Sequence, residues 1–249
     1  MFSPVSDSSN APDPGTPRMT RGRAIAEVVL CSSYPTQVAA AGVLTLLGVL
    51  PQSADGELNA TFVFGVSTLD AVLVVGLVVY LLRRQRESLA TVFLGDRPLW
   101  REAVLGLALV PLVTIGVAVV VRTVQALLPS LHNVPVNPLT AFMVDPAMAV
   151  AFGVMVVVAG GVREEMQRAF QLHRLTHHVT SPLVALVITS VAFGLGHTVQ
   201  GRDVAMATFG LGLFWGTLYL RRLSLVAAGV SHALFNLVQV WAASRALVP

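Results

Sequence analysis

The chain has 249 residues, of which 55% are hydrophobic and only 12% are charged, and its mean hydropathy is +0.74. A water-soluble fold of this length could not cover so much apolar surface, so the composition excludes a soluble globular protein and indicates an integral membrane protein. The net charge of +3 rests on Arg alone, because the sequence contains no Lys. The Arg residues are spread between apolar runs, which argues against a nucleic-acid partner. Cys31 is the only cysteine, so no internal disulfide can form.

The amino-terminal segment, residues 1–23, is rich in Pro, Ser and Asp and becomes basic at Arg18, Arg21 and Arg23. It lacks the apolar stretch that a cleavable signal peptide carries near its start. Its low hydrophobicity is typical of segments that cannot bury enough apolar surface to fold. We therefore expect a disordered basic tail.

Apolar runs follow along the rest of the chain, several of them near the length of about 20 residues that crosses a bilayer as a helix. They cover roughly 28–50, 61–82, 103–121, 147–162, 183–197, 204–220 and 224–243. The sequence therefore predicts an all-α polytopic membrane protein, a bundle of about 6–8 transmembrane helices. We expect amino-terminal transmembrane helices with an Arg-rich cytoplasmic connector over 24–135, and a carboxy-terminal membrane core over 136–249.

The Arg distribution between these runs also predicts an orientation. The tail and residues 83–101 hold many Arg, whereas 51–60 holds none and 122–146 holds Arg122 alone. Because cytoplasmic loops carry the excess of positive charge, we expect a cytoplasmic amino terminus. The composition, rich in Ala and Val with Arg in place of Lys, favours a bacterial protein, and we expect it in the plasma membrane. Strict alternation of spans would put Glu164 and His197 at opposite faces of the bilayer, unless 147–175 forms one long helix that carries Glu164 inward.

Polar residues that are costly in a low-dielectric core gather in three carboxy-terminal clusters. Glu164 and Glu165 are followed by Arg168, and the second cluster is Phe193-Gly194-Leu195-Gly196-His197. In the third, His232 and Asn236 share a helix face at i, i+4 spacing. Carboxylates, imidazoles and a carboxamide can together activate water, bind an oxyanion or ligate a metal. The same residues also fit a flanking ion pair and interfacial histidines, so spacing alone leaves both interpretations open.

In this order across successive spans, the three motifs resemble those of the CPBP family of intramembrane proteases, also called the ABI or type II CAAX prenyl endopeptidase family. The resemblance covers roughly residues 140–245, and the motifs Phe-x-x-x-His and His-x-x-x-Asn fit without gaps. The first motif departs from the family's Glu-Glu-x-x-x-Arg, because only two residues separate Glu165 from Arg168. Aligning the arginine leaves Arg163 in place of the first glutamate. Glu164 matches a family glutamate in either register and is four residues from Arg168, so we favour Glu164 as the base and expect it to pair with Arg168.

The resemblance implies an endopeptidase in which a glutamate activates water while His197, His232 and Asn236 bind the developing oxyanion or a metal. The site residues it predicts are Glu164, Glu165, Arg168, His197, His232 and Asn236. Zn²⁺, held by His197 and His232, is one implied cofactor, and a mechanism without metal is the other possibility. The implied partners are a peptide or protein substrate at the membrane and the lipid bilayer. The family name is not evidence for prenylated substrates, and the sequence leaves the oligomeric state open.

Two alternatives remain. A non-catalytic family member, such as an immunity factor or a scaffold, is favoured by the altered glutamate motif. A proton-coupled transporter would use Asp70, which lies inside an apolar run, together with Glu164 and the histidines as relay groups. For Asp70 itself we favour a hydrogen-bonded partner within the bundle. We expect His173 and His177 to be solvated near the headgroups. We expect Trp215 to lie near a span end or to face lipid, and to have no catalytic role.

Overall fold

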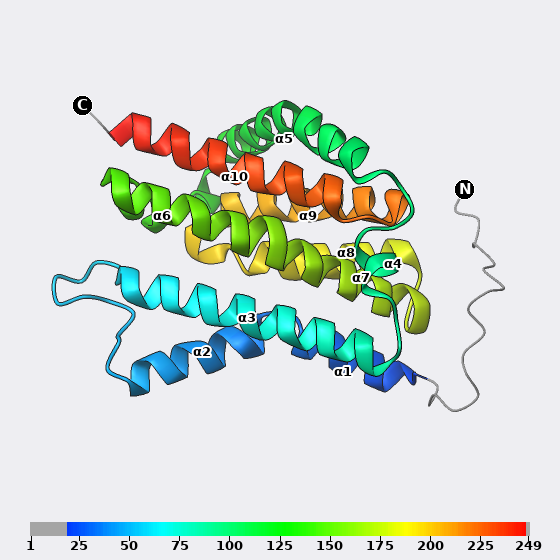
Figure 1. Cartoon of the computed structure of the whole chain (residues 1–249). Coiled ribbons are helices and arrows are strands. Elements are labelled where there is room, and N and C mark those ends of the chain that lie inside the picture. Colours follow the sequence, from blue (N-terminus) through cyan, green and yellow to red (C-terminus); the bar gives the residue numbers. More distant parts are fainter. Residues whose placement is uncertain (1–18, 248–249) are drawn as a thin grey trace.

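The structure, a computed structural model, describes residues 19–247, and the architecture of these residues is helical (Figure 1). The only β-type pairing among these residues is an isolated bridge between Gln52 and Leu58. The α-helices are α1 (Arg21–Leu30), α2 (Tyr34–Leu46), α3 (Ala60–Arg84), α4 (Leu89–Phe93), α5 (Leu99–Leu127), α6 (Pro146–Val156), α7 (Glu165–His178), α8 (Pro182–Leu195), α9 (Arg202–Arg222) and α10 (Val226–Leu247). Short helical turns are η1 (Pro129–Leu131), η2 (Pro138–Met143) and η4 (Thr198–Gln200), and η3 (Val157–Glu164) is a π-helix.

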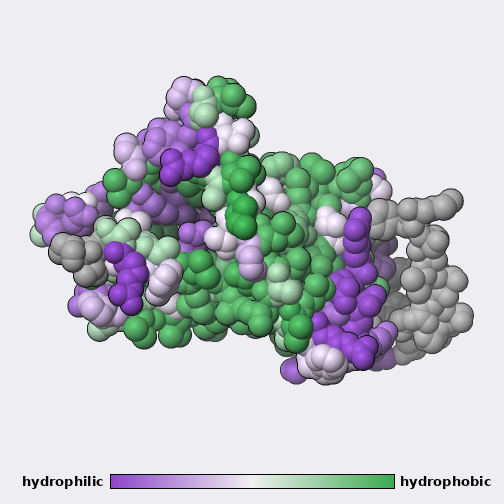
Figure 2. Space-filling model, turned by 90° about the horizontal axis from the view of Figure 1, so that it is seen from above, coloured by the Kyte–Doolittle hydropathy of each residue, from purple (hydrophilic) through white to green (hydrophobic). Residues whose placement is uncertain are grey.

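Six helical units of the described chain are long and apolar enough to cross a membrane, which confirms the polytopic all-α prediction. They are Arg21–Leu46, Ala60–Arg84, Leu99–Leu127, Pro146–His178, Arg202–Arg222 and Val226–Ala246. Figure 2 shows a hydrophobic band around the middle of the molecule between hydrophilic residues at its two ends. Such a band is the surface that a hydrocarbon layer covers.

The first apolar run is divided where the chain turns between α1 and α2. Ser33 has φ of +68°, a left-handed conformation that cannot continue a helix. The break brings the Ser33 side chain to α7, where its hydroxyl donates to Gln167 Oε1 at 2.8 Å. The prediction of a tail over 1–23 was wrong at its end, because Arg21 and Arg23 lie in α1, and residues 1–18 lie outside the described part of the chain.

The helical unit from Pro146 to His178 is continuous for 33 residues and combines α6, η3 and α7. In Figure 1 it runs along the whole length of the bundle. Glu164 lies within this unit and not at the end of a short span. The sequence analysis required one long helix over 147–175 for Glu164 to approach His197. This helix exists and is longer than expected at both ends. The π-helical segment at its centre adds a wider turn, which is common at functional sites.

Glycines allow α10 to approach the π-helical segment closely. A Cβ at Gly161 would lie 2.6 Å from the Ala233 Cβ, and one at Gly229 would lie 2.9 Å from the Gly161 carbonyl oxygen. Both distances are too short for real Cβ contacts, so no side chain fits at this crossing. The crossing sets His232 and Asn236 of α10 against η3.

The helix α8 is shorter than a membrane span, and it packs against α9. Gly212 faces Ser190 and Gly216 faces Leu186, so these two glycines serve packing within the chain. The chain leaves the helix at Leu195, and His197 follows in the connection to α9.

Candidate active site

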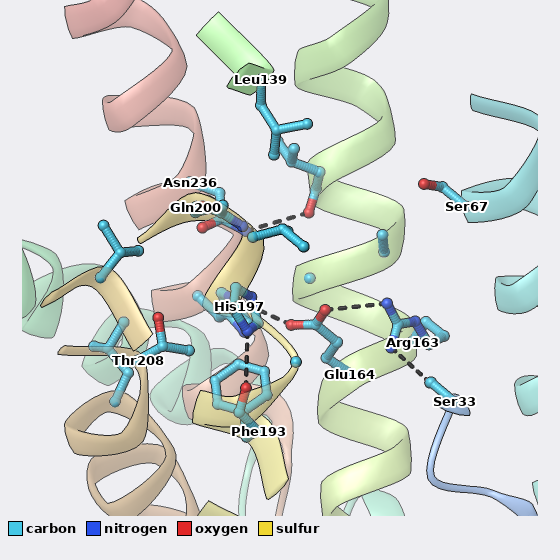
Figure 3. A pocket seen from close by; sticks show the side chains of 18 of the residues that line it. Ser33, Ser67, Leu139, Arg163, Glu164, Phe193, His197, Gln200, Thr208 and Asn236 are labelled. Carbon is cyan, nitrogen blue, oxygen red and sulfur yellow. Dashed lines mark hydrogen bonds and ion pairs between the residues drawn. The ribbon is translucent and has the colours of Figure 1, made fainter. Parts of the chain in front are cut away.

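A cavity of about 680 Å³ lies among the helices and contains most of the predicted site residues. Glu164, Arg168, His197, His232 and Asn236 line it, whereas Glu165 lies outside it. Figure 3 shows the Glu164 carboxylate pointing away from its own helix toward the side where His197 lies, with Asn236 on the neighbouring helix α10. Residues from three separate helical segments and one connection are therefore brought together at one cavity.

The Glu164 carboxylate is held through one oxygen and faces the cavity with the other. Arg163 Nη2 donates to Glu164 Oε1 at 3.0 Å. The second oxygen, Oε2, lies 3.7 Å from His232 Nε2. The side chain is 15% exposed, so the free oxygen is accessible from the cavity.

The Glu165 carboxylate, in contrast, is 1% exposed and has two close partners. Arg168 donates to Glu165 Oε1, and His232 Nδ1 lies 2.8 Å from the same oxygen. The predicted pairing of Glu164 with Arg168 was therefore wrong. Arg168 pairs with Glu165 at i, i+3 spacing within α7, and the neighbouring Arg163 is the ion partner of Glu164.

The two other polar side chains are positioned by backbone groups. His197 Nδ1 donates to the Phe193 carbonyl oxygen at 2.8 Å. The other ring nitrogen, Nε2, takes no part in this hydrogen bond. Asn236 Nδ2 lies 3.5 Å from the Val156 carbonyl oxygen, a weak contact that leaves the amide available to a ligand. A Cβ at Gly160 would contact Asn236 Nδ2 and would lie 3.1 Å from His232 Nε2. Gly160 thus leaves room at the point where these two nitrogens converge.

Aromatic rings complete the surroundings of His232. Trp215 is fully buried and its ring stacks on that imidazole, with centroids 3.9 Å apart and an interplanar angle of 17°. The Arg168 guanidinium lies 4.4 Å from the Phe193 ring centroid and 5.7 Å from that of Trp215. The prediction that Trp215 lies near a span end or faces lipid was wrong, because its indole packs between helices beside the site.

The donor set can be tested against a zinc ion. His197 and His232 each have Nδ1 bonded to an oxygen, as metal-ligating histidines usually do. A zinc site in an enzyme also needs a third protein ligand at about 2.0–2.3 Å from the metal. Among the described residues, no group of three or more His, Cys, Asp or Glu side chains has an arrangement that could hold a metal ion. The side chains as they stand do not fit a formed zinc site.

Comparison with known families adds to this geometry. A family model described as type II CAAX prenyl endopeptidase Rce1-like matches residues 146–238. The match over these residues supports the CPBP family. The family predicted from the three motifs is thereby confirmed, and its general class is the CAAX-type intramembrane protease. Searches of curated proteins and of solved structures gave no match.

The CPBP match extends from α6 to α10 and contains every predicted site residue. It leaves out the turn between α1 and α2, helix α2 and helix α3, which line one side of the cavity with Ser33, Gln37 and Asp70 respectively. These three residues were not among the predicted site residues. The signal that could have found Asp70 was its carboxylate within an apolar run, and the signal for Arg163 was a second cation beside the glutamates.

Two further predictions concern residues near the site or at the bundle end. Asp70 is fully buried, and Thr36 Oγ1 donates to its Oδ1 while Gln37 Nε2 donates to its Oδ2 at 3.4 Å. The expected partner within the bundle is confirmed. His173 is not merely solvated, because its Nε2 donates to Glu87 Oε2 at 2.5 Å, and His177 Nδ1 donates to the His173 carbonyl oxygen at 2.8 Å.

Proposed function

We propose that the chain is an intramembrane endopeptidase in which Glu164 is the general base that activates a water molecule. One observation carries this assignment above all. Of the two adjacent glutamates, only Glu164 lines the cavity and has an oxygen facing it, whereas Glu165 is buried and bound by Arg168 and His232. A general base must reach the proton that it removes, and Glu165 does not reach the cavity.

The spacing of Glu164 and His232 suits a water molecule between them. The distance of 3.7 Å from Glu164 Oε2 to His232 Nε2 is too long for a direct hydrogen bond and invites a bridging water. Glu164 removes a proton from that water molecule as the water oxygen attacks the carbonyl carbon of the peptide. The protonated carboxyl then gives the proton to the amine that leaves, which restores the carboxylate.

When water attacks the peptide carbonyl carbon, the carbonyl oxygen becomes an oxyanion, and hydrogen-bond donors must face that oxygen. Asn236 Nδ2 is a donor in every protonation state, and Gly160 keeps the space in front of it open. His197 and His232 add donors through Nε2 when their rings are protonated. Donors already fixed at the position of the oxyanion are worth several kcal/mol of transition-state stabilisation, about 2.7–4 for one of them.

The walls of the cavity support an apolar peptide as the substrate. On the side of α3 and α6 the lining is hydrophobic, contributed by Phe62, Val63, Val66, Phe152 and Met155. A peptide segment in or next to the bilayer would place its apolar side chains there and its scissile bond at Glu164. The proposal extends to peptide or protein substrates presented with lipid, and the prenyl group in the family description is not carried over to them.

Zn²⁺ at His197 and His232 remains a prediction that metal analysis tests. Because the described side chains do not form a three-ligand site, the steps above contain no metal. We expect the protein still to cleave the peptide after a chelator has been added and the chelator with its bound metal has been removed. Loss of cleavage that returns with added Zn²⁺ would instead assign the two imidazoles to a metal.

A non-catalytic role is the second candidate, and one observation favours it. Arg163 replaces a family glutamate in one register and forms an ion pair with Glu164. If the charge of Arg163 fully compensated the charge of the Glu164 carboxylate, Glu164 would be a poor base. The fold would then serve as a scaffold or immunity factor. A cleavage assay separates this candidate from the protease.

The test is cleavage of a quenched peptide library, presented with lipid, by the purified wild-type chain and by the variants Glu164→Gln and His232→Ala. Bound metal is quantified on the same samples. We expect cleavage by the wild type and a loss of at least about 100-fold in Glu164→Gln, the lower range for removing a general base. No cleavage by folded wild type across the library would reject the protease in favour of the non-catalytic role.

A further inference from the structure

The Arg163 guanidinium lies between two buried or nearly buried carboxylates. Its Nε lies 3.5 Å from Asp70 Oδ2, an ion-pair contact without a hydrogen bond, and its Nη2 donates to Glu164 Oε1 at 3.0 Å. Asp70 is fully buried, and Arg163 is 8% exposed. One positive charge is thus shared by two negative charges in surroundings that screen them poorly.

The other side of the guanidinium is also occupied. Arg163 Nη1 donates to Ser33 Oγ at 2.9 Å and to Gln167 Oε1 at 3.1 Å. Figure 3 shows Arg163 between Glu164 on one side and Ser33 on the other. The contacts on Nε and Nη1 leave Nη2 to reach Glu164, and it binds one of the two carboxylate oxygens.

The position of Asp70 is itself held by neighbouring side chains. Thr36 and Gln37 of α2 donate to its two oxygens. Asp70 belongs to α3, outside residues 146–238 that match the family model. The amino-terminal helices therefore supply a fixed negative charge that faces the catalytic helix through Arg163.

An arginine freed from these contacts would bind a carboxylate differently. The planar guanidinium matches a carboxylate in a fork-to-fork geometry that engages both oxygens. Such a pair would cover Glu164 Oε2, the oxygen that now faces His232 and the cavity. Asp70 competes for the same cation and opposes that arrangement.

We propose that Asp70 and Arg163 are positioning residues for Glu164, in which Asp70 holds the guanidinium so that it orients Glu164 through one oxygen and leaves the other free to activate water. This inference rests on the proposed function of Glu164 as the base. Neither residue reacts with the substrate, and Asp70 acts through Arg163.

The experiment compares kcat and KM of the lipid-presented peptide for the full-length wild type and for Asp70→Asn, which keeps the shape and removes the charge. We expect kcat to fall by about 10–100-fold, the range for supporting residues around a site, while KM stays unchanged. Glu102→Gln is the matched control. Glu102 is a fully buried carboxylate bound by Arg222 at 2.6 Å, and it does not line the cavity. We expect that variant to lose stability and keep its kcat.

A double-mutant cycle with Arg163→Gln distinguishes positioning from a general effect on folding. Because Asp70 acts through Arg163, we expect the double variant Asp70→Asn/Arg163→Gln to have about the same kcat as Arg163→Gln alone. Independent roles would instead make the two losses multiply, and that result would overturn the inference. So would a wild-type kcat in folded Asp70→Asn.

Thr36→Val serves as a second probe if Asp70→Asn does not fold. It removes the hydroxyl that donates to Asp70 and keeps the carboxylate in place. We expect a smaller loss of kcat, again without a change in KM, and an unchanged kcat in this variant would overturn the inference. No cleavage by folded wild type would reject the proposed function and this inference together, whereas cleavage by wild type and by Asp70→Asn at equal kcat rejects this inference alone.

Discussion

The imidazole of His232 is bound by Glu165 on one edge and lies flat on the indole of Trp215. Its Nδ1 is 2.8 Å from Glu165 Oε1, and the two rings stack with centroids 3.9 Å apart. A hydrogen bond in the ring plane and a stack on the ring face together fix both the direction and the tilt of the ring. His232 Nε2 is thereby aimed toward Glu164 and the cavity.

Replacing Trp215 with Leu should lower kcat more than replacing it with Phe. An aromatic stack is worth about 0.5–1.5 kcal/mol beyond the area it buries, and Phe retains part of it. If all of that energy serves to orient His232, kcat falls by up to about tenfold in Trp215→Leu. Trp100→Leu is the control, because Trp100 is 64% exposed on α5 and far less packed. Equal kcat values for Trp215→Leu and wild type would contradict the orienting role.

The adjacent glutamates should differ in what their substitution costs. Glu165→Gln leaves the buried Arg168 without its carboxylate partner, and breaking a buried ion pair costs about 3–5 kcal/mol of stability. Glu164→Gln faces the cavity and should unfold at nearly the wild-type temperature while losing cleavage. Thermal unfolding in detergent, measured beside the cleavage assay, compares the two. A stable and fully active Glu165→Gln would show that His232 is oriented by other contacts.

Gly160→Ala should reduce cleavage without unfolding the protein. The added methyl group would contact Asn236 Nδ2 and crowd His232 Nε2, so the two side chains must move apart. Gly76→Ala is the matched control, because a Cβ at Gly76 in helix α3 meets nothing within 4 Å. Ala in place of a helical Gly stabilises by about 0.5–1 kcal/mol where space allows. We expect kcat to fall in Gly160→Ala and to stay unchanged in Gly76→Ala, and equal activities would argue against a role for this opening.

Glu87, in the connector between α3 and α5, forms an ion cluster with His173 and Arg174 of α7. This cluster should make the stability of the fold depend on pH. Burial raises the pKa of the Glu87 carboxyl, but the hydrogen bond from His173 and the charge of Arg174 outweigh it and hold the pKa below its ordinary value of 4.5. A carboxyl whose folded-state pKa is depressed stabilises the fold above its unfolded pKa, and this stabilisation is lost as the pH falls through the folded value.

The variant that tests this is Glu87→Gln. The measurement is its thermal unfolding temperature, and that of the wild type, at pH values from neutral to acidic. We expect Glu87→Gln to unfold at a lower temperature than wild type near pH 7, and the difference to shrink as the pH falls below about 4.5. Glu57→Gln, in an exposed loop, is the control and should show little difference at any pH. A difference of constant size across this range would mean that the charge of Glu87 contributes nothing.

Much of the fold follows from the sequence because the relevant forces are local. Runs of about 20 apolar residues become membrane helices whatever their neighbours are, and the membrane-length helices lie where these runs predicted them. The candidate site residues were predicted from polar groups that are costly in an apolar run and from the order of the family motifs. Five of the six predicted residues line one cavity, and the sixth, Glu165, lies directly behind it, bound to His232.

Only the tertiary structure decided which charge each charged group faces. The sequence favoured Glu164 with Arg168 at i, i+4 spacing, whereas Arg168 pairs with Glu165 at i, i+3 spacing, and His232 of α10 contacts the same carboxylate oxygen. The contact of Asp70 with Arg163 joins residues 93 positions apart and depends on how α3 packs against η3. Ion pairs of this kind depend on distances of a few ångströms between separate helices, and no periodicity along the chain encodes them. The sequence by itself determined a helical membrane bundle and the inventory of its site, and the folded arrangement decided which glutamate faces the cavity.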